Sequence, residues 1–444
     1  PGCTERLPPV RAPANPAGAA AGAAAAAESR ALSVSVREGA LEDIENAESY
    51  DVGLRVFIGR RQAGAASSDI SEAALMALAE RVVAMAKLAP EDPYCGLAPD
   101  DALAQSQPDL DLVDPTGYDA QALEAEALAL DAAAQAVPGV WKTEGAGASW
   151  SASARAVVTS AGFQGAAMST GWSRQVSAVA KDDSGGMERD YDYARARHRA
   201  DLRDIEAIGR EAGERAVARL NPRKPESGRM AVLFEPRVAN DLLGAFLSAI
   251  SGPAVARGVS FLKDKMGAQV FAAGTRIEET PHRPRGLACR PFDAEGVAVK
   301  ARALVDEGRL TTWLLNAASA RQLSLPPTGH ATGGFGGPPG AGASNVHWIP
   351  GARTPEAMIA DLKRGVLITE TFGASINPNT GDYSVGASGL WIENGEKAYP
   401  VSEMTVAGNL LDMFARAEPA SDLEFRYAVN APTLLIDNLA VSGQ

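Results

Sequence analysis

Residues 377–396 read NPNTGDYSVGASGLWIENGE and hold three tight-turn signals around a short apolar run. The Asn394-Gly395 step is the strongest short signal for a β-hairpin, because both central residues of a type I′ turn need positive φ. The run before this stretch, GVLITETF (365–372), is rich in β-branched and aromatic residues and predicts a strand. Asn and Asp in such turns usually bond their own backbone. By themselves, these residues favour a structural hairpin over a binding loop.

The rest of the C-terminal half extends this pattern of hairpins. RMAVLFE (229–235) predicts a strand, and Pro236 starts a helix to about residue 251 at a position where proline is tolerated. A second hairpin is predicted with its turn at residues 306–308. A helix is expected from its cap Thr354 through Leu362, closed by a C-terminal glycine, Gly365. Residues 228–444 are therefore expected to form a mainly antiparallel, curved or barrel-like sheet with few helices.

The N-terminal half alternates strands and helices. Period-two patterns over residues 31–45, 50–68 and 151–183 predict strands of a sheet that has one covered face. Helices are expected from Ser71 to Pro90, over 121–136 and over 201–220. We therefore expect an α+β fold of two domains, the first over residues 31–220 with helices packed on its sheet. The Pro-rich segment 221–228 is the natural boundary. Residues 1–30, Pro-rich and then Ala-rich, suggest a low-complexity tail, disordered or partly helical, with a secretory signal as the weaker alternative.

Length, net charge and cysteine content argue against several classes of protein. A chain of 444 residues exceeds the size of one hydrophobic core, which agrees with two domains. The net charge of −13 opposes binding to nucleic acid, and no apolar run approaches the length of a membrane span. Residues 91–131 contain eleven carboxylates and no Lys or Arg, which indicates a solvated face or a dock for a basic partner. Three scattered cysteines fit a reducing cytoplasm.

Candidate metal ligands and nucleophiles are scarce. No two histidines lie three to five residues apart and no His-Glu step occurs, so a self-contained zinc site is not expected from His198, His282, His330 or His347. His330 and His347 flank a Gly/Pro-rich loop, which leaves open that they approach each other. GASGL (386–390) lacks the last glycine of a G-x-S-x-G nucleophile elbow. Cys95 has no basic neighbour in sequence that would lower its pKa.

Long stretches of the chain resemble the TldD/PmbA family, specifically its PmbA (TldE) branch. The strongest match is GVLITETFGASINPNTGDYSVGASGLWIENGEKAYPVSEMTVAGNL (365–410), and the resemblance runs from about residue 31 to the end. Further segments match in order: GLRVFIGRRQAGAASSD (53–69), APEDPYCGL (89–97), GGMERDYDYARARH (185–198), LKDKMGAQVF (262–271), PHRPRGLACRPFDAEGV (281–297) and DNLAVSGQ (437–444).

The resemblance implies a role in cytoplasmic peptide processing by a TldD–PmbA heterodimer that acts on small unfolded peptides. In the TldD branch, zinc is held by a His-Glu-x-x-x-His motif on the helix after the first strand of the second domain, and by a Cys near the C-terminus. The matching residues 240–248 here contain no His, Glu or Cys, and residues 424–438 contain no Cys. The resemblance thus implies a subunit with no catalytic and no metal-binding residues, whose partner carries the zinc.

Under this interpretation the opening stretch lines a peptide passage or a subunit seam. The candidate peptide or interface residues are Asn377, Asp382, Tyr383, Ser384, Gly386 and Trp391, with Trp391 packing inward. Expected partners are a TldD-like subunit and unfolded peptides, without nucleic acid or membrane. Two alternatives stay open: a homodimeric peptide-binding or regulatory module without protease activity, and an autonomous hydrolase that uses Ser388 or Cys95.

Overall fold

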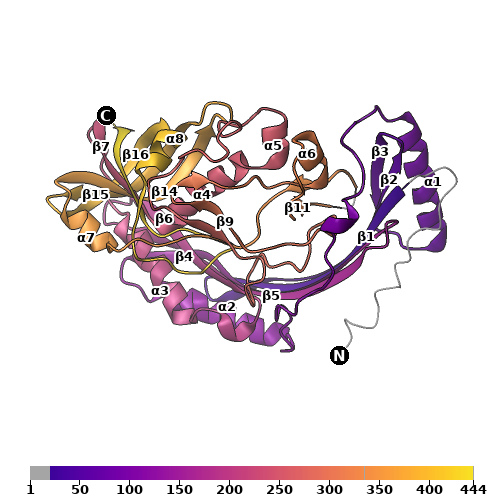
Figure 1. The fold of residues 1–444 in the computed structure, drawn as a ribbon. Coiled ribbons are helices and arrows are strands. Elements are labelled where there is room, and N and C mark those ends of the chain that lie inside the picture. The colour runs from indigo at the N-terminus through magenta and orange to yellow at the C-terminus, as the bar shows by residue number, and fades with distance from the viewer. Residues whose placement is uncertain (1–20, 335, 444) are drawn as a thin grey trace.

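The computed structural model describes residues 21–334 and 336–443 (Figure 1). Its α-helices are α1 (Glu72–Leu88), α2 (Ala120–Gln135), α3 (Ile205–Ala218), α4 (Pro236–Ala249), α5 (Gly252–Ala256), α6 (Ala317–Gln322), α7 (Pro355–Ala360) and α8 (Leu410–Arg416). The strands are β1 (Ala21–Arg37), β2 (Ala40–Ile58), β3 (Arg61–Ser67), β4 (Val140–Thr159), β5 (Gln164–Lys181), β6 (Met187–Ala196), β7 (Gly228–Phe234), β8 (Ile277–Glu279), β9 (Arg302–Asp306), β10 (Arg309–Leu310), β11 (Ala331–Thr332), β12 (Gly340–Ala341), β13 (Val346–Trp348), β14 (Arg364–Ile376), β15 (Asp382–Glu393), β16 (Glu396–Asn409), β17 (Glu418–Pro419), β18 (Val429–Asn430) and β19 (Leu434–Ser442). Among these residues, no helix has the length and apolarity that a membrane crossing requires.

The N-terminal sheet has the strand order β3-β2-β1-β4-β5-β6, and every neighbouring pair is antiparallel. Alternate residues of β1 such as Leu32, Val34 and Val36 are buried on one face. There they join the same core cluster as Leu123 and Leu130 of α2. Helix α1 covers the other end of this face, and its N-cap Ser71 accepts a hydrogen bond from the backbone N–H of Ala74, as the sequence predicts.

The Ala-rich segment 21–30 lies inside this sheet, so the prediction of a tail is wrong for these residues. They form the first half of β1 and pair with β2 on one edge and with β4 on the other. Alanine has a high helix propensity and little hydrophobic contrast, which hid the period-two pattern. Two flanking strands override that propensity, and the small Ala24 and Ala26 side chains are buried. Residues 1–20 of the predicted tail lie outside the described residues.

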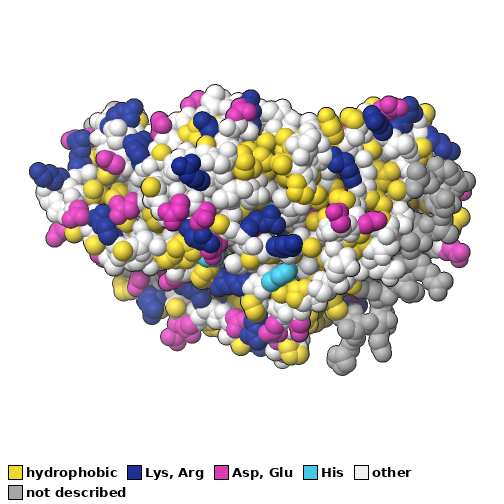
Figure 2. All heavy atoms as spheres, viewed as in Figure 1, with side chains coloured by type: hydrophobic (Ala, Val, Ile, Leu, Met, Phe, Trp, Pro, Cys, Tyr) yellow, Lys and Arg dark blue, Asp and Glu magenta, His cyan; other side chains and the backbone are white. Residues whose placement is uncertain are grey.

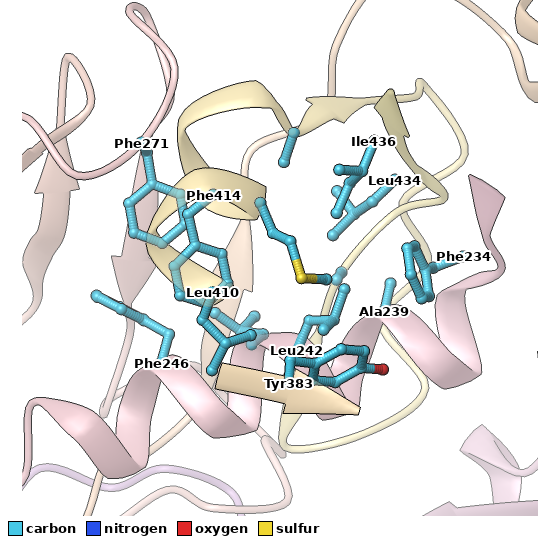
Figure 3. Packing of buried hydrophobic residues seen from close by; sticks show 14 of the residues in the cluster. Phe234, Ala239, Leu242, Phe246, Phe271, Tyr383, Leu410, Phe414, Leu434 and Ile436 are labelled. Atoms are coloured by element: carbon cyan, nitrogen blue, oxygen red, sulfur yellow. The ribbon is translucent and has the colours of Figure 1, made fainter. Parts of the chain in front are cut away.

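The C-terminal part contains a closed barrel, which confirms the predicted curved or barrel-like sheet. Strands β16, β15, β14, β7 and β19 follow one another, and the β16–β19 pairing closes the ring. The pairs are antiparallel except β14 with β7. Figure 3 shows the core between this sheet and its helices, where Phe246 of α4 and Phe414 of α8 pack edge to face at 6.1 Å between ring centroids.

The predicted hairpin turn at Asn394-Gly395 joins β15 to β16, with φ of 50° and 85°. The predicted end of the helix that starts at Thr354 is wrong, because α7 already ends at Ala360. Gly365 pairs with Ala231 in the parallel β14–β7 ladder instead. A Cβ on Gly365 would lie 2.9 Å from the carbonyl oxygen of Ala231, so this glycine permits close strand approach rather than capping a helix.

The N-terminal sheet bows beneath the C-terminal part, with α2 and α3 on its outer face (Figure 1). Contact between the two parts occurs at both ends of the sheet. At one end Arg55 of β2 pairs with Glu295 at 3.3 Å, and at the other Arg237 of α4 donates to the carbonyl of Tyr191 in β6. Between these contacts the inner face of the sheet borders cavities.

Three carboxylates of the acidic segment 91–131 are buried, so the prediction of a wholly solvated face is wrong for them. Glu126 accepts from the guanidinium groups of Arg174 and Arg199, and Asp114 accepts from the backbone N–H of Arg199. Asp131 accepts from the Gly39 backbone N–H. The partners are distant in sequence, and burying a carboxylate is tolerated only when such groups bond it.

Candidate functional site

The turn at 377–382 is built by its own polar side chains. Asn377 Oδ1 accepts from the backbone N–H of Asn379 at 3.0 Å, and Asp382 accepts from the Thr380 hydroxyl at 2.6 Å and from Asn409 Nδ2 at 3.1 Å. The bonds from Thr380 and Asn409 lower the pKa of Asp382. Both candidate residues are thus exposed but already bonded within the turn.

The other residues of the predicted site are divided between core and surface. Trp391 is 4% exposed and stacks on Tyr399 at 6.3 Å, which agrees with the expected inward packing. Gly386 leaves room for Phe372, whose ring would lie 2.4 Å from a Cβ at that position. Ser384 is exposed on β15. Tyr383 is buried beside Leu242 of α4, as Figure 3 shows, and burial and then the Asp241 carboxylate raise its pKa.

The histidines serve separate roles. His330 is 1% exposed; it bonds Glu279 Oε2 at 2.7 Å through Nε2, while Nδ1 lies 2.7 Å from the Thr328 hydroxyl. Burial lowers the pKa of His330, although Glu279 opposes this, so the ring is neutral and donates Nε2–H to the carboxylate. His347 lies near Glu278, the neighbouring β8 residue, whose side chain points to the opposite face. The two histidines therefore do not form one site.

The two possible nucleophiles lack an activating base. Ser388 is 6% exposed within β15, and no histidine bonds it among the described residues. Burial raises the pKa of Cys95, which keeps the thiol protonated. Both residues therefore have the environment of structural side chains.

A polar concave region lies along β6, where two cavities meet. One has a volume of 570 Å³ and is lined by β4, β5 and β6, and the other has 420 Å³ and is lined mainly by β6, α4 and β14. Tyr191, Tyr193 and Glu370 line both, so we call the combined space the β6 cleft. Helix α4 contributes Arg237, Val238, Asn240 and Asp241, and the strand β18 region contributes Tyr427, Ala428 and Val429. Asn240 and Asp241 begin the segment 240–248, which the resemblance given above matches to the zinc-motif helix of the TldD branch.

One ionic network fixes the wall of the β6 cleft. Arg237 donates to both oxygens of Asp190, at 2.7 and 3.2 Å, and to Glu235 at 3.1 Å. Arg219, next to the end of α3, donates to Glu370 at 2.5 Å and lies 3.4 Å from Asp190. Burial opposes ionisation of Asp190, but the bonds from Arg237 lower its pKa overall. The network ties β6 to α3, α4 and β14.

A second network lies beside the first. Arg203 donates to Asp192 at 2.6 Å and to Glu211 at 2.5 Å, and Arg215 donates to the other oxygen of Glu211 at 2.7 Å. Burial, then repulsion from Glu211, raises the pKa of Asp192. Burial opposes the ionisation of Glu211, but nearby arginines lower its pKa overall. These carboxylates hold guanidinium groups and thereby stiffen the back of the cleft.

Tyrosines form the cleft surface itself. Tyr191 and Tyr193 stack at 6.3 Å between ring centroids. Tyr193 of the N-terminal sheet also contacts Tyr427 of the C-terminal part, at 5.4 Å between ring centroids. Burial, then the neighbouring Tyr427, raises the pKa of Tyr193. The phenol thus stays protonated and can donate a hydrogen bond. Together these rings offer flat apolar surface with polar edges, which suits an extended peptide.

Small hydroxyl side chains cover the inner face of the N-terminal sheet that leads to the cleft. The strand register places Ser33, Ser149, Ser173 and Arg195 side by side on four strands, and Ser49, Ser29, Ser153 and Ser169 in a parallel row. Three cross-strand hydroxyl pairs bond at 2.7 to 3.1 Å. This face is opposite to the one that packs on α2 and α3, because residues directly paired across strands share a face.

The donor set of the β6 cleft does not fit a zinc ion. Among the residues that the structure describes, no His or Cys lines either cavity, and Asp190, Asp192 and Glu370 are bonded to arginines. Zinc sites in proteins use three or four ligands that are mostly imidazole or thiolate. Within residues 21–334 and 336–443, no group of three His, Cys, Asp or Glu side chains is placed to hold a metal ion.

Sequence reasoning missed the β6 cleft, although its signal is visible. Residues 190–193 read Asp-Tyr-Asp-Tyr, and a period of two on a strand sends the acids to one face and the tyrosines to the other. The arginines that neutralise these acids come from α3 and α4, at distant sequence positions. Such pairings have no local signature.

Lys and Arg side chains gather across the middle of the face shown in Figure 2, between the C-terminal part and the α2–α3 layer.

Comparisons with known proteins cover almost the whole chain. The PmbA/TldA metallopeptidase domain 1 matches residues 24–86, the central domain matches 107–220, and the C-terminal domain matches 227–443. Metalloprotease PmbA of Escherichia coli O157:H7 is 36% identical over 93% of this chain and 90% of its own length. The Metalloprotease PmbA homolog of Haemophilus influenzae is 34% identical, with the same coverage of each chain.

Solved structures share the fold. A putative modulator of DNA gyrase from Bacteroides thetaiotaomicron aligns with a TM-score of 0.87 at 24% identity, over 96% of this chain and 95% of that one. TldE from Thermococcus kodakarensis aligns with a TM-score of 0.85 at 20% identity, over 96% and 97%. Because the matching domains and the similar PmbA proteins extend over nearly all of the sequence, the chain belongs to the PmbA branch of the PmbA/TldD metallopeptidase family.

Proposed function

We propose that this chain is the non-catalytic, peptide-holding subunit of a zinc metallopeptidase whose metal is carried by a TldD-like partner. The observation that carries the proposal is the β6 cleft, where α4 presents Arg237, Asn240 and Asp241 instead of metal ligands. A zinc peptidase needs protein ligands for the ion and an open position for water. The partner supplies both, and this chain supplies the wall that holds the substrate.

Small unfolded peptides in the cytoplasm are the proposed substrates. An extended peptide exposes its main-chain amides, and the hydroxyl-covered sheet face and the Tyr191 and Tyr193 rings can contact any sequence. A folded protein has its main-chain groups paired internally and is too wide for cavities of 570 and 420 Å³. The cleft would therefore select its substrates mainly by their extended shape.

Reconstitution tests the proposal directly. The chain would be purified alone, with a TldD-like partner, and with that partner carrying His→Ala changes in its zinc motif. We expect no stoichiometric zinc in the isolated chain, and cleavage of an unfolded peptide such as reduced, alkylated insulin B chain only when the intact partner is present. Zinc-dependent cleavage by the isolated chain would overturn the proposal.

One further outcome distinguishes the proposed metallopeptidase subunit from the alternative of a peptide-binding or regulatory module. Under that alternative the isolated chain binds the peptide, yet adding the partner produces neither a complex by size-exclusion chromatography nor faster cleavage. A serine- or cysteine-reactive probe that labels Ser388 or Cys95 with loss of activity would instead support an autonomous hydrolase.

A further inference from the structure

Arg195 is the one charged residue on the wall of the 570 Å³ cavity that has no oppositely charged partner among the described residues. The cavity is lined by five charged side chains. Asp190, Asp192 and Glu370 are bonded to arginines, and Arg189 lies 3.4 Å from Glu144. The wall therefore carries one uncompensated positive charge, at a known position.

The guanidinium of Arg195 is held in place without being neutralised. Its central carbon lies 5.7 Å from the ring centroid of Tyr193, a cation–π distance that orients the planar group without using its N–H donors. Its cross-strand neighbour is Ser173, whose hydroxyl bonds that of Ser149. Five N–H donors in a planar fork match the two oxygens of a carboxylate.

The position of Arg195 within the cleft is the second part of the argument. Strand β6 runs from Arg189 to Arg195 along the cavity, and Tyr191 and Tyr193 between them also line the cavity over α4. A peptide that lies over these two rings has one end over α4. Its other end reaches Arg195. The charge thus lies beside the path of the peptide rather than at a random surface point.

We propose that Arg195 binds a carboxylate of the peptide held in the β6 cleft, either the C-terminal carboxylate or that of an acidic side chain. This inference rests on the proposed peptide-holding function and adds to it a preferred chemistry and an orientation for the bound chain. A peptide with an uncharged end would leave the guanidinium of Arg195 in water, and its affinity for the cleft would not be increased by this residue.

The test compares three synthetic octapeptides of Gly, Ser and Ala that carry an uncharged N-terminal fluorophore. One ends in a free carboxylate, one in an amide, and one is an amide with a single Glu in the last position. Binding to the full chain is measured by fluorescence anisotropy, without a partner and with a TldD-like partner that carries His→Ala changes in its zinc motif, so that the peptides are not cleaved. A charge-assisted bond in a partly exposed site should make at least one of the two carboxylate peptides bind about tenfold more tightly than the plain amide. The two carboxylate peptides distinguish the terminal source from the side-chain source.

Three variants assign the effect to Arg195. Arg195→Gln should abolish the preference for carboxylate and leave the affinity for the amide within about twofold, and Arg195→Lys should retain part of the preference, because lysine keeps the charge but loses the fork. Arg189→Gln is the matched control: it changes an arginine on the same strand and cavity wall that already has a carboxylate partner, and it should keep the wild-type preference.

The outcomes separate the two proposals. Equal affinity of all three peptides for the wild type, or a preference that persists in Arg195→Gln, overturns the role of Arg195 while the peptide-holding function stands. Absence of binding by every peptide, also with the partner present, overturns both.

Discussion

Arg237 shows how one side chain joins the two halves of the chain. It lies at the start of α4 in the C-terminal part, yet its strongest contact is with Asp190 of β6 in the N-terminal sheet. It also donates to the carbonyl of Thr369, and its guanidinium lies over the Tyr191 ring. Removing it leaves Asp190, which is 4% exposed, with the backbone N–H of Tyr191 and the more distant guanidinium of Arg219.

We expect Arg237→Ala to lower the free energy of unfolding by about 3 kcal/mol, because an incompletely paired buried carboxylate remains. Urea denaturation measures the change. Arg210→Ala is the control: its pair with Glu214 on α3 is exposed and 4.0 Å long, so the change should stay within about 0.5 kcal/mol. Equal effects of the two substitutions would contradict a structural role for the Arg237–Asp190 pair.

Glu279 makes stability depend on pH in the acid range. Burial would raise its pKa, but the bonds from His330 and from the Ser344 N–H and hydroxyl lower the pKa to about 2. Because the pKa in the folded protein lies below that of the unfolded chain, the carboxylate stabilises the fold above about pH 4.5. This contribution is lost as the pH falls from about 4.5 towards 2, and it amounts to about 3 kcal/mol.

We therefore expect the free energy of unfolding of wild type to fall more steeply between pH 5 and 2.5 than that of Glu279→Gln. Guanidinium chloride denaturation at a series of pH values measures both slopes. A Glu279→Gln profile parallel to that of wild type would show that this carboxylate does not account for the acid loss.

At the scale of elements, glycines set how closely helices approach. A Cβ on Gly209 of α3 would lie 2.5 Å from the Cβ of Ala133 in α2, whereas a Cβ on Gly244 of α4 would meet no atom within 4 Å from the described residues outside its own helix backbone. The two positions are both helical, so their intrinsic propensities are the same. Only the packing around them differs.

Gly244→Ala should stabilise the protein by up to about 1 kcal/mol through the helix propensity of alanine. Gly209→Ala should destabilise it by about 1 to 3 kcal/mol, because α2 and α3 must separate to admit the methyl group. Thermal denaturation followed by circular dichroism compares the two. Stabilisation by both substitutions would mean that the α2–α3 contact relaxes easily.

At the scale of the whole molecule, the N-terminal sheet has an open edge along the first half of β2. Strand β3 pairs only with residues 52–58 of β2, and residues 40–49 have no strand on their outer side among the described residues. All ten are exposed. Antiparallel pairing of this edge with a second copy would bring together like charges from Glu42, Asp43, Glu45 and Glu48, which opposes self-association.

Neutralising this edge should therefore promote self-pairing. We expect the variant with Asp43→Asn and Glu45→Gln to self-associate about tenfold more strongly than wild type in sedimentation velocity, since each opposed like-charge pair costs roughly 0.2 to 1 kcal/mol. A control with Glu393→Gln and Glu396→Gln, two exposed residues beside the β15–β16 turn, should behave as wild type. An unchanged edge variant would indicate that charge does not keep this edge free.

Much of the fold was predictable because its signals are local. Ser71 caps α1, the Asn394-Gly395 turn joins β15 to β16, and Pro236 starts α4, each through preferences that act within a few residues. The candidate site was less predictable. Asn377 and Asp382 share one turn, but Trp391 lies at the other end of β15, Tyr383 and Trp391 pack in the core, and the β6 cleft was not recognised.

The sequence by itself determined the α+β class, the positions of most helices and hairpins, the likeness to the PmbA branch, and the shortage of imidazole and thiolate ligands. Only the tertiary structure decided that residues 21–30 form a central strand, that serines from four strands share one face, and that Arg237 reaches Asp190. The reason is physical: backbone preferences are short-range, whereas strand register and ion pairing depend on groups that only packing brings together.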